Sequence, residues 1–369
     1  MATNTQKTSN VPNLRFPGFE GEWEEKKLGD ICQMQAGKFV SATEIFEKPQ
    51  EALFPCFGGN GLRGYTKSFN YNGRYSLIGR QGALCGNVTL TNGKFHATEH
   101  AVVVKPSSDL DTGWLYYLLN HLNLNQYATG AAQPGLSVQN LEKVGVTISN
   151  SAEEQQKIFS FLSIIDQRIQ TQNKIIKELK TLMKGMLERL FTQDLRFNSL
   201  NGEAFSEWQT KKLSDVLSIG NGKDYKHLGQ GKIPVFGTGG IMTYVDSFLY
   251  DGETVCIGRK GTIDAPLYYK GKIWTVDTLF YTHSFLGVIP KFIFYIFQRV
   301  NWKEYNEASG VPSLSKSTIE KIDIEIPSIA EQNYISDFLS TIEKKIQKEE
   351  ILLSYYQKQK NYLLRNIFI

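Results

Sequence analysis

Cysteine is scarce in this sequence of 369 residues. The four cysteines are Cys32, Cys56, Cys85 and Cys256. They are widely and unevenly spaced and include no C-x-x-C pair, so neither a disulfide framework nor a zinc site is expected. His96 and His100 lie four residues apart, but no cysteine or carboxylate cluster joins them at ligand spacing. We therefore predict buried free thiols and no metal site.

Long apolar runs are also missing. No stretch approaches the ~18–20 residues of a membrane span, and the polar segment 1–12 lacks the apolar core of a signal peptide. We expect a cytoplasmic protein with no membrane partner, in which residues 1–12 form a flexible tail. The formal net charge is only +4, which permits nucleic-acid binding without requiring it.

Familiar catalytic motifs are absent as well. No Gly-Lys pair is followed by Ser or Thr, as a P-loop requires, and no G-x-S-x-G or H-E-x-x-H motif occurs. The sequence has no Pro-Pro dipeptide, which excludes the (N/D)PP(Y/F) motif of amino-methyltransferases. We predict no catalytic residue and no cofactor for this chain, and we expect that it is not an enzyme.

What the sequence does contain is a long internal repeat. Three patterns return in the same order, W-x-x-K-K-L-x-D at 23–30 and 208–215, I-G-R-x-G at 78–82 and 257–261, and E-Q at 154–155 and 331–332. The spacing drifts by a few residues, as short loop insertions would produce. The chain therefore consists of two related halves.

Each half divides into a head and a helix. Residues 13–150 and 196–327, the first and second heads, are rich in glycine, aromatic and β-branched residues, which favours short strands and turns. Each head also contains one short helix, near 114–122 and near 292–300. Residues 151–195 and 328–369 are almost free of glycine and proline and predict two long helices.

Apolar residues follow a coiled-coil spacing of three and four along both helices. These seam positions are Leu162, Ile165, Ile169, Ile176, Leu179, Met183 and Met186 in the first helix, and Leu339, Ile342, Ile346, Leu353, Tyr356 and Leu363 in the second. Glu349 and Lys360 interrupt the second seam. Each helix could pack on its own head alone, but the seam is longer than one small head would cover. We predict an antiparallel pair about 42 Å long, with the heads at opposite ends of a dumbbell.

Two related heads on a spacer suit a ligand with two half-sites, and DNA half-sites lie ~34–36 Å apart. The repeated loop presents Arg80 and Gln81 in the first head and Arg259 and Lys260 in the second. Arginine pairs with guanine, glutamine with adenine, and lysine with guanine or phosphate. The alternative is that the glycines only form a hairpin turn and the arginine is solvated.

Further loops in both heads carry candidate contacts to bases or phosphates. The full set of predicted DNA-binding residues is Lys38, Asn60, Lys67, Arg80, Gln81, Gln133 and Ser137 in the first head, and Lys223, Lys226, Thr238, Arg259, Lys260, Ser313, Ser315 and Lys316 in the second.

Taken together, these features resemble the specificity (S) subunit of type I restriction–modification systems. The most specific pieces are the opening of each head, such as residues 16–30, and the head-to-helix junctions at 148–155 and 326–332. The second junction has the family's P-x-x-x-E-Q pattern, whereas the first has Ser149 in place of the proline.

The resemblance implies an α+β fold with two pseudo-repeated mixed α/β target recognition domains, 13–150 and 196–327. The long antiparallel coiled-coil helices, 151–195 and 328–369, correspond to the family's central and C-terminal conserved regions. It also implies that each domain reads one half of a bipartite, asymmetric site in double-stranded DNA, and that the helices set the gap. Two methyltransferase (M) subunits with S-adenosylmethionine and restriction (R) subunits with ATP and Mg would be the partners. Glu349 and Lys360 could lie where an M subunit covers the helices.

Other functions remain open at this point. The chain could be a stand-alone or differently partnered two-headed DNA-binding protein without a methyltransferase role. It could also be a scaffold whose heads bind peptides or glycans, which predicts no salt-dependent affinity for DNA.

Overall fold

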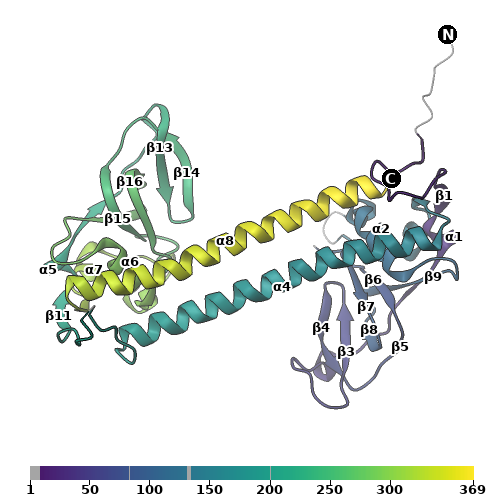
Figure 1. Ribbon diagram of the computed structural model, residues 1–369, viewed down its shortest axis with the longest axis horizontal. Helices are drawn as coiled ribbons and strands as arrows, with labels where there is room; N and C mark the ends of the chain where they lie inside the picture. The colour runs from purple at the N-terminus through teal and green to yellow at the C-terminus, as the bar shows by residue number, and fades with distance from the viewer. Residues whose placement is uncertain (1–8, 83, 131–133, 200) are drawn as a thin grey trace, which may run out of the picture. The chain divides into compact units, whose positions relative to one another are not determined.

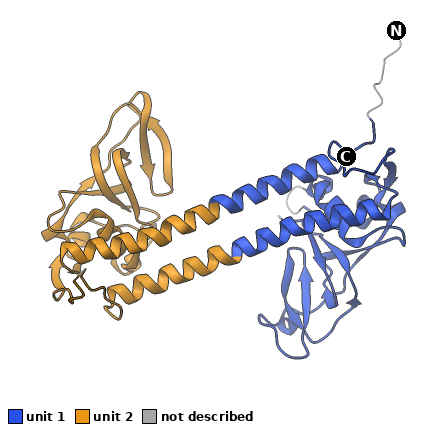
Figure 2. Cartoon of the chain, viewed as in Figure 1, with its two compact units in different colours: residues 1–173, 351–369 blue, residues 174–350 orange. Residues whose placement is uncertain are grey.

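The computed structural model describes residues 9–82, 84–130, 134–199 and 201–369 (Figure 1). The chain forms two compact units, and Figure 2 shows them in different colours. Unit 1 contains residues 1–173 and 351–369, and unit 2 contains residues 174–350. None of the helices in the described part of the chain combines the length and the apolar character that a bilayer crossing needs.

In its described residues, the head of unit 1 is built from short strands and three short helices. In chain order these are β1 (Glu24–Lys27), α1 (Leu28–Ile31), β2 (Cys32–Ala36), β3 (Phe54–Gly58), β4 (Gly61–Thr66), β5 (Tyr71–Asn72), β6 (Tyr75–Gly79), β7 (Val88–Thr91), β8 (Lys94–Ala97), β9 (Ala101–Pro106), α2 (Thr112–His121), α3 (Val138–Glu142) and β10 (Gly145–Ile148). Two 3₁₀ turns complete it, Ala42–Glu44 and Leu124–Tyr127.

The strands of this head form two four-stranded sheets, in the orders β2-β9-β6-β7 and β4-β3-β8-β5, and a separate β1-β10 pair. Strands β3 and β8 run parallel, with Cys56 opposite His96. The alternation of buried and exposed positions along β2 fits a sheet with one covered face. Helix α2 lies against this sheet, and its Trp114 and Leu118 are fully buried in the core.

The head of unit 2 repeats this plan with longer strands. Its elements are β11 (Gln209–Lys212), α5 (Leu213–Val216), β12 (Ser218–Asn221), β13 (Gln230–Gly237), β14 (Gly240–Val245), β15 (Tyr250–Gly258), β16 (Leu267–Thr275), β17 (Leu279–His283), α6 (Pro290–Arg299), a 3₁₀ turn (Trp302–Tyr305), α7 (Lys316–Glu320) and β18 (Asp323–Ile326). The longer β15 and β16 join the strands into one sheet, β12-β17-β15-β16-β13-β14, beside a β11-β18 pair.

Two long helices, α4 (Ala152–Phe191) and α8 (Ile329–Ile367), contribute to both units. Within unit 1 the start of α4 packs beside the end of α8, since Leu162 and Leu364 share one core. Within unit 2 the end of α4 packs beside the start of α8, where Leu190 and Leu339 share another. The helices are therefore antiparallel in each unit, and the predicted mixed α/β heads with two long helices are confirmed.

The predicted seam positions lie on the inner faces of these helices. All thirteen of the positions named above are buried or half-buried, and none is exposed. The polar position Lys360 is part of this packing: its Nζ lies 2.6 Å from Asp166 Oδ1 of α4. Tyr117 of α2 donates to the other oxygen, Asp166 Oδ2, at 2.8 Å, and burial raises the pKa of Tyr117. Lys360, which interrupts the apolar seam of α8, is therefore paired with a carboxylate of α4.

Unit 2 also combines a tyrosine, a carboxylate and a lysine, but its lysine comes from α6 and not from α8. Tyr295 of α6 donates to Glu343 of α8 at 2.9 Å. The cation is Lys291, from the first turn of α6, with its Nζ 2.7 Å from Glu343 Oε2. Glu349, the other break, pairs with Lys345 one turn earlier on α8. Neither predicted break in the seam needs a partner protein to satisfy its charge.

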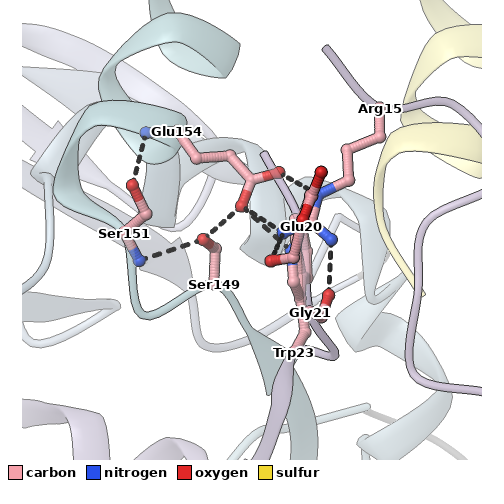
Figure 3. A network of polar contacts seen from close by, with 7 residues as sticks. All are labelled: Arg15, Glu20, Gly21, Trp23, Ser149, Ser151 and Glu154. Atoms are coloured by element: carbon pink, nitrogen blue, oxygen red, sulfur yellow. Dashed lines mark hydrogen bonds and ion pairs between the residues drawn. The ribbon is translucent and has the colours of Figure 1, made fainter. Parts of the chain in front are cut away.

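The E-Q motif at the start of each long helix attaches that helix to its head. In unit 1 Glu154 is 1% exposed and accepts hydrogen bonds from Arg15 Nε (2.7 Å), Arg15 Nη2 (3.0 Å), Trp23 Nε1 (3.2 Å) and Ser149 Oγ (2.6 Å) (Figure 3). These bonds hold the carboxylate, and the hydrogen bond to Glu154 raises the pKa of Arg15. The neighbouring Gln155 accepts from the backbone of Asp111 and donates to the Ser149 carbonyl.

In unit 2 the equivalent Glu331 is fully buried and pairs with Arg196 through Nε (3.1 Å) and Nη2 (2.9 Å). Pro327 stands where unit 1 has Ser149, and proline has no hydroxyl to donate. Trp208 Nε1, the counterpart of Trp23 Nε1, has no hydrogen-bond partner among the described residues. The first junction therefore has two more hydrogen bonds to its carboxylate than the second.

All four cysteines are buried free thiols, as predicted. Burial raises the pKa of Cys32 and of Cys256 to about 12. At neutral pH these two thiols stay protonated and unreactive.

Candidate nucleic-acid interface

The two loops predicted separately in the first head lie side by side in unit 1. The loop after β6 contains Arg80 and Gln81, and the segment before α3 contains Gly135 and Leu136. Leu136 N donates to Arg80 O at 2.8 Å, and Gln81 forms an isolated β-bridge with Gly135. The two loops of the first head are therefore adjacent and joined by backbone contacts.

Unit 2 brings the corresponding loops together through the same backbone bonds. Leu314 N donates to Arg259 O at 2.9 Å, and Lys260 forms the matching β-bridge with Ser313. The side chains change between the units while the backbone frame stays the same. This pattern is typical of a shared scaffold that carries different recognition groups.

The last glycine of the I-G-R-x-G loop is required by its conformation. Gly82 has φ +85° and Gly261 has φ +86°, in the left-handed region that other residues rarely adopt. The first glycine is required by close packing, because a Cβ on Gly79 would collide with the carbonyl oxygen of Gly59. The loop therefore holds Arg80 in a fixed backbone position.

Arg80 is half-buried and Arg259 is exposed. Arg259 lies over the ring of Phe280, with its Cζ 5.9 Å from the ring centroid. Neither arginine forms an ion pair within the described residues. Their charges are therefore not neutralised by an internal carboxylate.

Lys38 and Lys223, which follow Gly37 and Gly222, each have a backbone fixed by hydrogen bonds. Lys38 N donates to Ala97 O at 2.9 Å, and the Lys38 carbonyl lies 3.1 Å from Nε2 of the buried His96. In unit 2 Lys223 N donates to Thr275 O at 2.8 Å, and its carbonyl accepts from Trp274 Nε1 at 2.9 Å. The backbones of Lys38 and Lys223 are thus hydrogen-bonded to strands β8 and β16, whereas their side chains are exposed.

Several predicted residues have local structural roles. Ser137 and Ser315 are the N-caps of α3 and α7, accepting hydrogen bonds from the backbones of Asn140 and Thr318. Lys316 lies 3.6 Å from Glu320 one turn along α7. These roles explain the residues without a ligand, so a DNA contact from them stays a prediction.

The remaining predicted residues occupy turns and exposed strand ends. Asn60 lies in the β3–β4 turn and accepts from Asn87 Nδ2 at 3.3 Å. Thr238 lies in the matching β13–β14 turn. Lys67 and Lys226 are exposed, and Ser313 is half-buried. Gln133 lies outside the described residues.

A cleft of about 580 Å³ opens beside the Arg80 loop of unit 1. Its lining includes the turn 58–61 and the side chains of Arg63, Gln81 and His100. Neither Arg63 nor His100 is among the residues that the sequence predicts to bind DNA, and the spacing of His100 from His96 bears only on a metal site. The repeat does contain a signal for His100. It stands where the second head has Thr278, and it lies beside the I-G-R-x-G loop, whose fourth residue differs between the halves.

A family model described as the type I restriction modification DNA specificity domain matches this chain twice, at residues 20–181 and 205–353. The type I restriction enzyme EcoprrI specificity subunit of Escherichia coli is 46% identical over 154 residues, which is 42% of this chain and 38% of that protein. A putative type I specificity subunit of Mycoplasma pneumoniae is 24% identical over 275 residues, 72% of each chain.

Solved structures show the same fold. The crystal structure of a type I restriction-modification S subunit from M. genitalium has a TM-score of 0.73 at 18% identity, and the match covers 97% of this chain and 99% of that one. A second chain comes from work on complex assembly and conformational transition of the type I R-M system. It has a TM-score of 0.50 at 12% identity, over 95% of this chain and 97% of that one.

Proposed function

Because the chain belongs to the family of type I restriction-modification DNA specificity domains, we propose that it is the DNA-recognition subunit of a type I restriction–modification complex. Each head reads one half of a bipartite, asymmetric site in double-stranded DNA. The observation that carries this proposal is the loop pair built twice on one backbone frame, with Arg80 and Gln81 in one head and Arg259 and Lys260 in the other. Different side chains on equal frames suit two different half-sites.

In this proposal the chemistry belongs to the partners. Methyltransferase subunits bind S-adenosylmethionine and methylate adenine N6, and restriction subunits use ATP and Mg. The chain contributes recognition and a docking surface, and the predicted cytoplasmic location agrees with that role.

The outer face of α8 in unit 1 is the surface we assign to a methyltransferase subunit. Ile351, Tyr355 and Tyr362 are 54%, 60% and 58% exposed and follow helical spacing, so they lie on one face. Exposed apolar residues on a common face mark protein interfaces, and tyrosine is enriched there. The inner seam of the same helix is already covered by α4, which leaves this outer face for a partner.

The decisive experiment is a methylation map of the whole genome by long-read sequencing. Cells expressing a compatible M subunit are compared with and without this chain. A new bipartite adenine-methylation motif that depends on the chain supports the proposal and identifies both half-sites. If the chain binds the M subunit but no motif appears, the proposed function is wrong.

Replacing Arg80 by alanine is expected to weaken discrimination at the first half-site by about 1–3 kcal/mol, the usual contribution of one good bidentate base contact. Methylation of the second half-site pattern and co-purification with the M subunit should be unchanged. The matched variant is Arg259→Ala, which should relax the second half-site instead. Unaltered base preference in Arg80→Ala would remove this arginine from the recognition surface.

Removing one heptad from both long helices should shorten the gap between the half-sites. Lys180 of α4 lies 2.6 Å from Glu350 of α8, so residues 180–186 and 344–350 are matched heptads within unit 2. Seven helical residues span about 10.5 Å, or roughly three base pairs at ~3.4 Å each, and the seam keeps its phase. The gap is read from the methylation motif, and deletion from α4 alone is the control. A gap of the original length would show that the helices do not set it.

A further inference from the structure

The cleft beside the Arg80 loop contains a short chain of polar contacts. His100 Nδ1 lies 2.9 Å from Gln81 Oε1, and His100 Nε2 lies 3.2 Å from Glu99 Oε1. An amide oxygen and a carboxylate oxygen only accept hydrogen bonds, so the contact to Gln81 needs a proton on Nδ1, and both contacts together need the doubly protonated ring. The exposed Gln81 side chain is thereby held in one orientation at the rim of the cleft, instead of rotating freely in solvent.

The hydrogen-bonding capacity left on Gln81 fits one base. His100 occupies one lone pair of Gln81 Oε1, which leaves the second lone pair and both N–H groups of the amide. Glutamine reads adenine in the major groove by accepting from N6 and donating to N7. The bond from His100 therefore preserves the acceptor and donor that adenine requires.

Unit 2 shows that this contact is not needed for the loop to fold. Arg80 N donates to His100 O at 2.8 Å, and Arg259 N donates to Thr278 O at the same 2.8 Å. The second head thus builds the same frame with Thr278 in place of His100 and Lys260 in place of Gln81. The contact between Gln81 and His100 is therefore a feature of the first head alone and not of the shared frame.

We propose that Gln81 is a specificity-determining residue that reads one adenine of the first half-site, and that His100 is the positioning residue that orients its amide. This inference rests on the proposed function, since it assigns a base to one side chain of that same surface. The second head has no such pair at this place, and Lys260 can only donate. The two heads are therefore expected to differ at the equivalent position of their half-sites.

The test uses the full chain, expressed with a compatible M subunit in cells lacking other adenine methyltransferases, and long-read methylation maps. Gln81→Ala and His100→Ala should each reduce the preference for adenine at one position of the first half-site by about fivefold or more. His100→Asn places an amide N–H near the position of Nδ1 and should retain most of that preference. Thr278→Ala is the matched control in the second head, and should leave the first half-site unchanged.

The outcomes separate the inference from the function on which it rests. A bipartite motif that keeps its adenine preference in Gln81→Ala overturns the inference alone, as does a lost preference for a different base. Equal losses in His100→Ala and His100→Asn, spread over all positions and accompanied by weaker co-purification with the M subunit, would show a structural role and also overturn it. If the unaltered chain produces no motif at all, the proposed function and the inference fail together.

Discussion

Replacing Glu154 by alanine is expected to lower the free energy of unfolding of unit 1 by about 3–5 kcal/mol, the cost of removing one partner from a buried ion pair. Glu154 is 1% exposed and the Arg15 side chain 14% exposed, so the guanidinium would keep its charge with the Glu20 and Gly21 carbonyls as its acceptors and with little access to water. Trp23 Nε1 and Ser149 Oγ would lose their acceptor as well. The start of α4 would then be poorly attached to the first head.

Hydrogen exchange measured by mass spectrometry can assign this loss to one unit, which a single unfolding curve for a chain of two units cannot do. Protection should fall across the first head and remain in unit 2. The matched control is Glu153→Ala, because Glu153 lies one residue earlier on α4 and is exposed. Glu331→Ala should destabilise unit 2 less, because Glu331 accepts only from Arg196 among the hydrogen bonds described above. Protection equal to that of the unaltered chain would contradict this account of the junction.

Replacing Phe368 by alanine should also destabilise unit 1 by about 3–5 kcal/mol, as expected for a large ring removed from a core. Phe368 is 2% exposed, and its ring centroid lies 5.7 Å from that of Trp114 and 6.2 Å from that of Trp23. The cavity would open between α2 and the opening segment of the head. Tryptophan fluorescence and hydrogen exchange of α2 are the direct measurements.

Two variants make this prediction specific. Ile369→Ala alters a neighbouring residue that is 40% exposed and should have little effect on unfolding. Phe191→Ala removes the matching ring of unit 2, which packs on Phe292 and Trp208 at 5.1 and 5.9 Å, and should destabilise unit 2 instead. If Phe368→Ala leaves the protection of α2 unchanged, the ring is not part of the core that the structure describes.

The sequence was most informative where the signal is local or repeated. The seam from Leu162 to Met186 follows helical spacing, and the returning W-x-x-K-K-L-x-D and I-G-R-x-G patterns align the halves without any structure. The two loops of each head that carry predicted DNA-binding residues could also be identified separately, because glycine and polar side chains mark exposed turns. Their contact could not, since Arg80 and Leu136 meet only through the tertiary fold.

Long-range polar partners were the main omission. From the sequence alone, Lys360 only interrupts the heptad pattern of its helix. Its partner Asp166 lies on the other long helix, far away in the sequence, so the pattern does not indicate the pairing. Glu154 belongs to the repeated E-Q pattern, but nothing in the sequence indicates that it pairs with Arg15. In the sequence the spacing of His100 from His96 bears only on a metal site, whereas in the structure His100 contacts Gln81. In each case the chemistry of one residue is set by a neighbour that the fold supplies.

The composition of unit 1 from two separate segments has a consequence for synthesis on the ribosome. Residues 174–350 are contiguous and contain a complete core of their own, whereas the core of unit 1 needs Leu364, Ile367 and Phe368. Those residues emerge only after the whole of unit 2 has been translated. The usual order, in which the earlier domain folds first during synthesis, is therefore reversed for the final packing of this chain. Until then the first head has an incomplete core, and its apolar residues are exposed to aggregation.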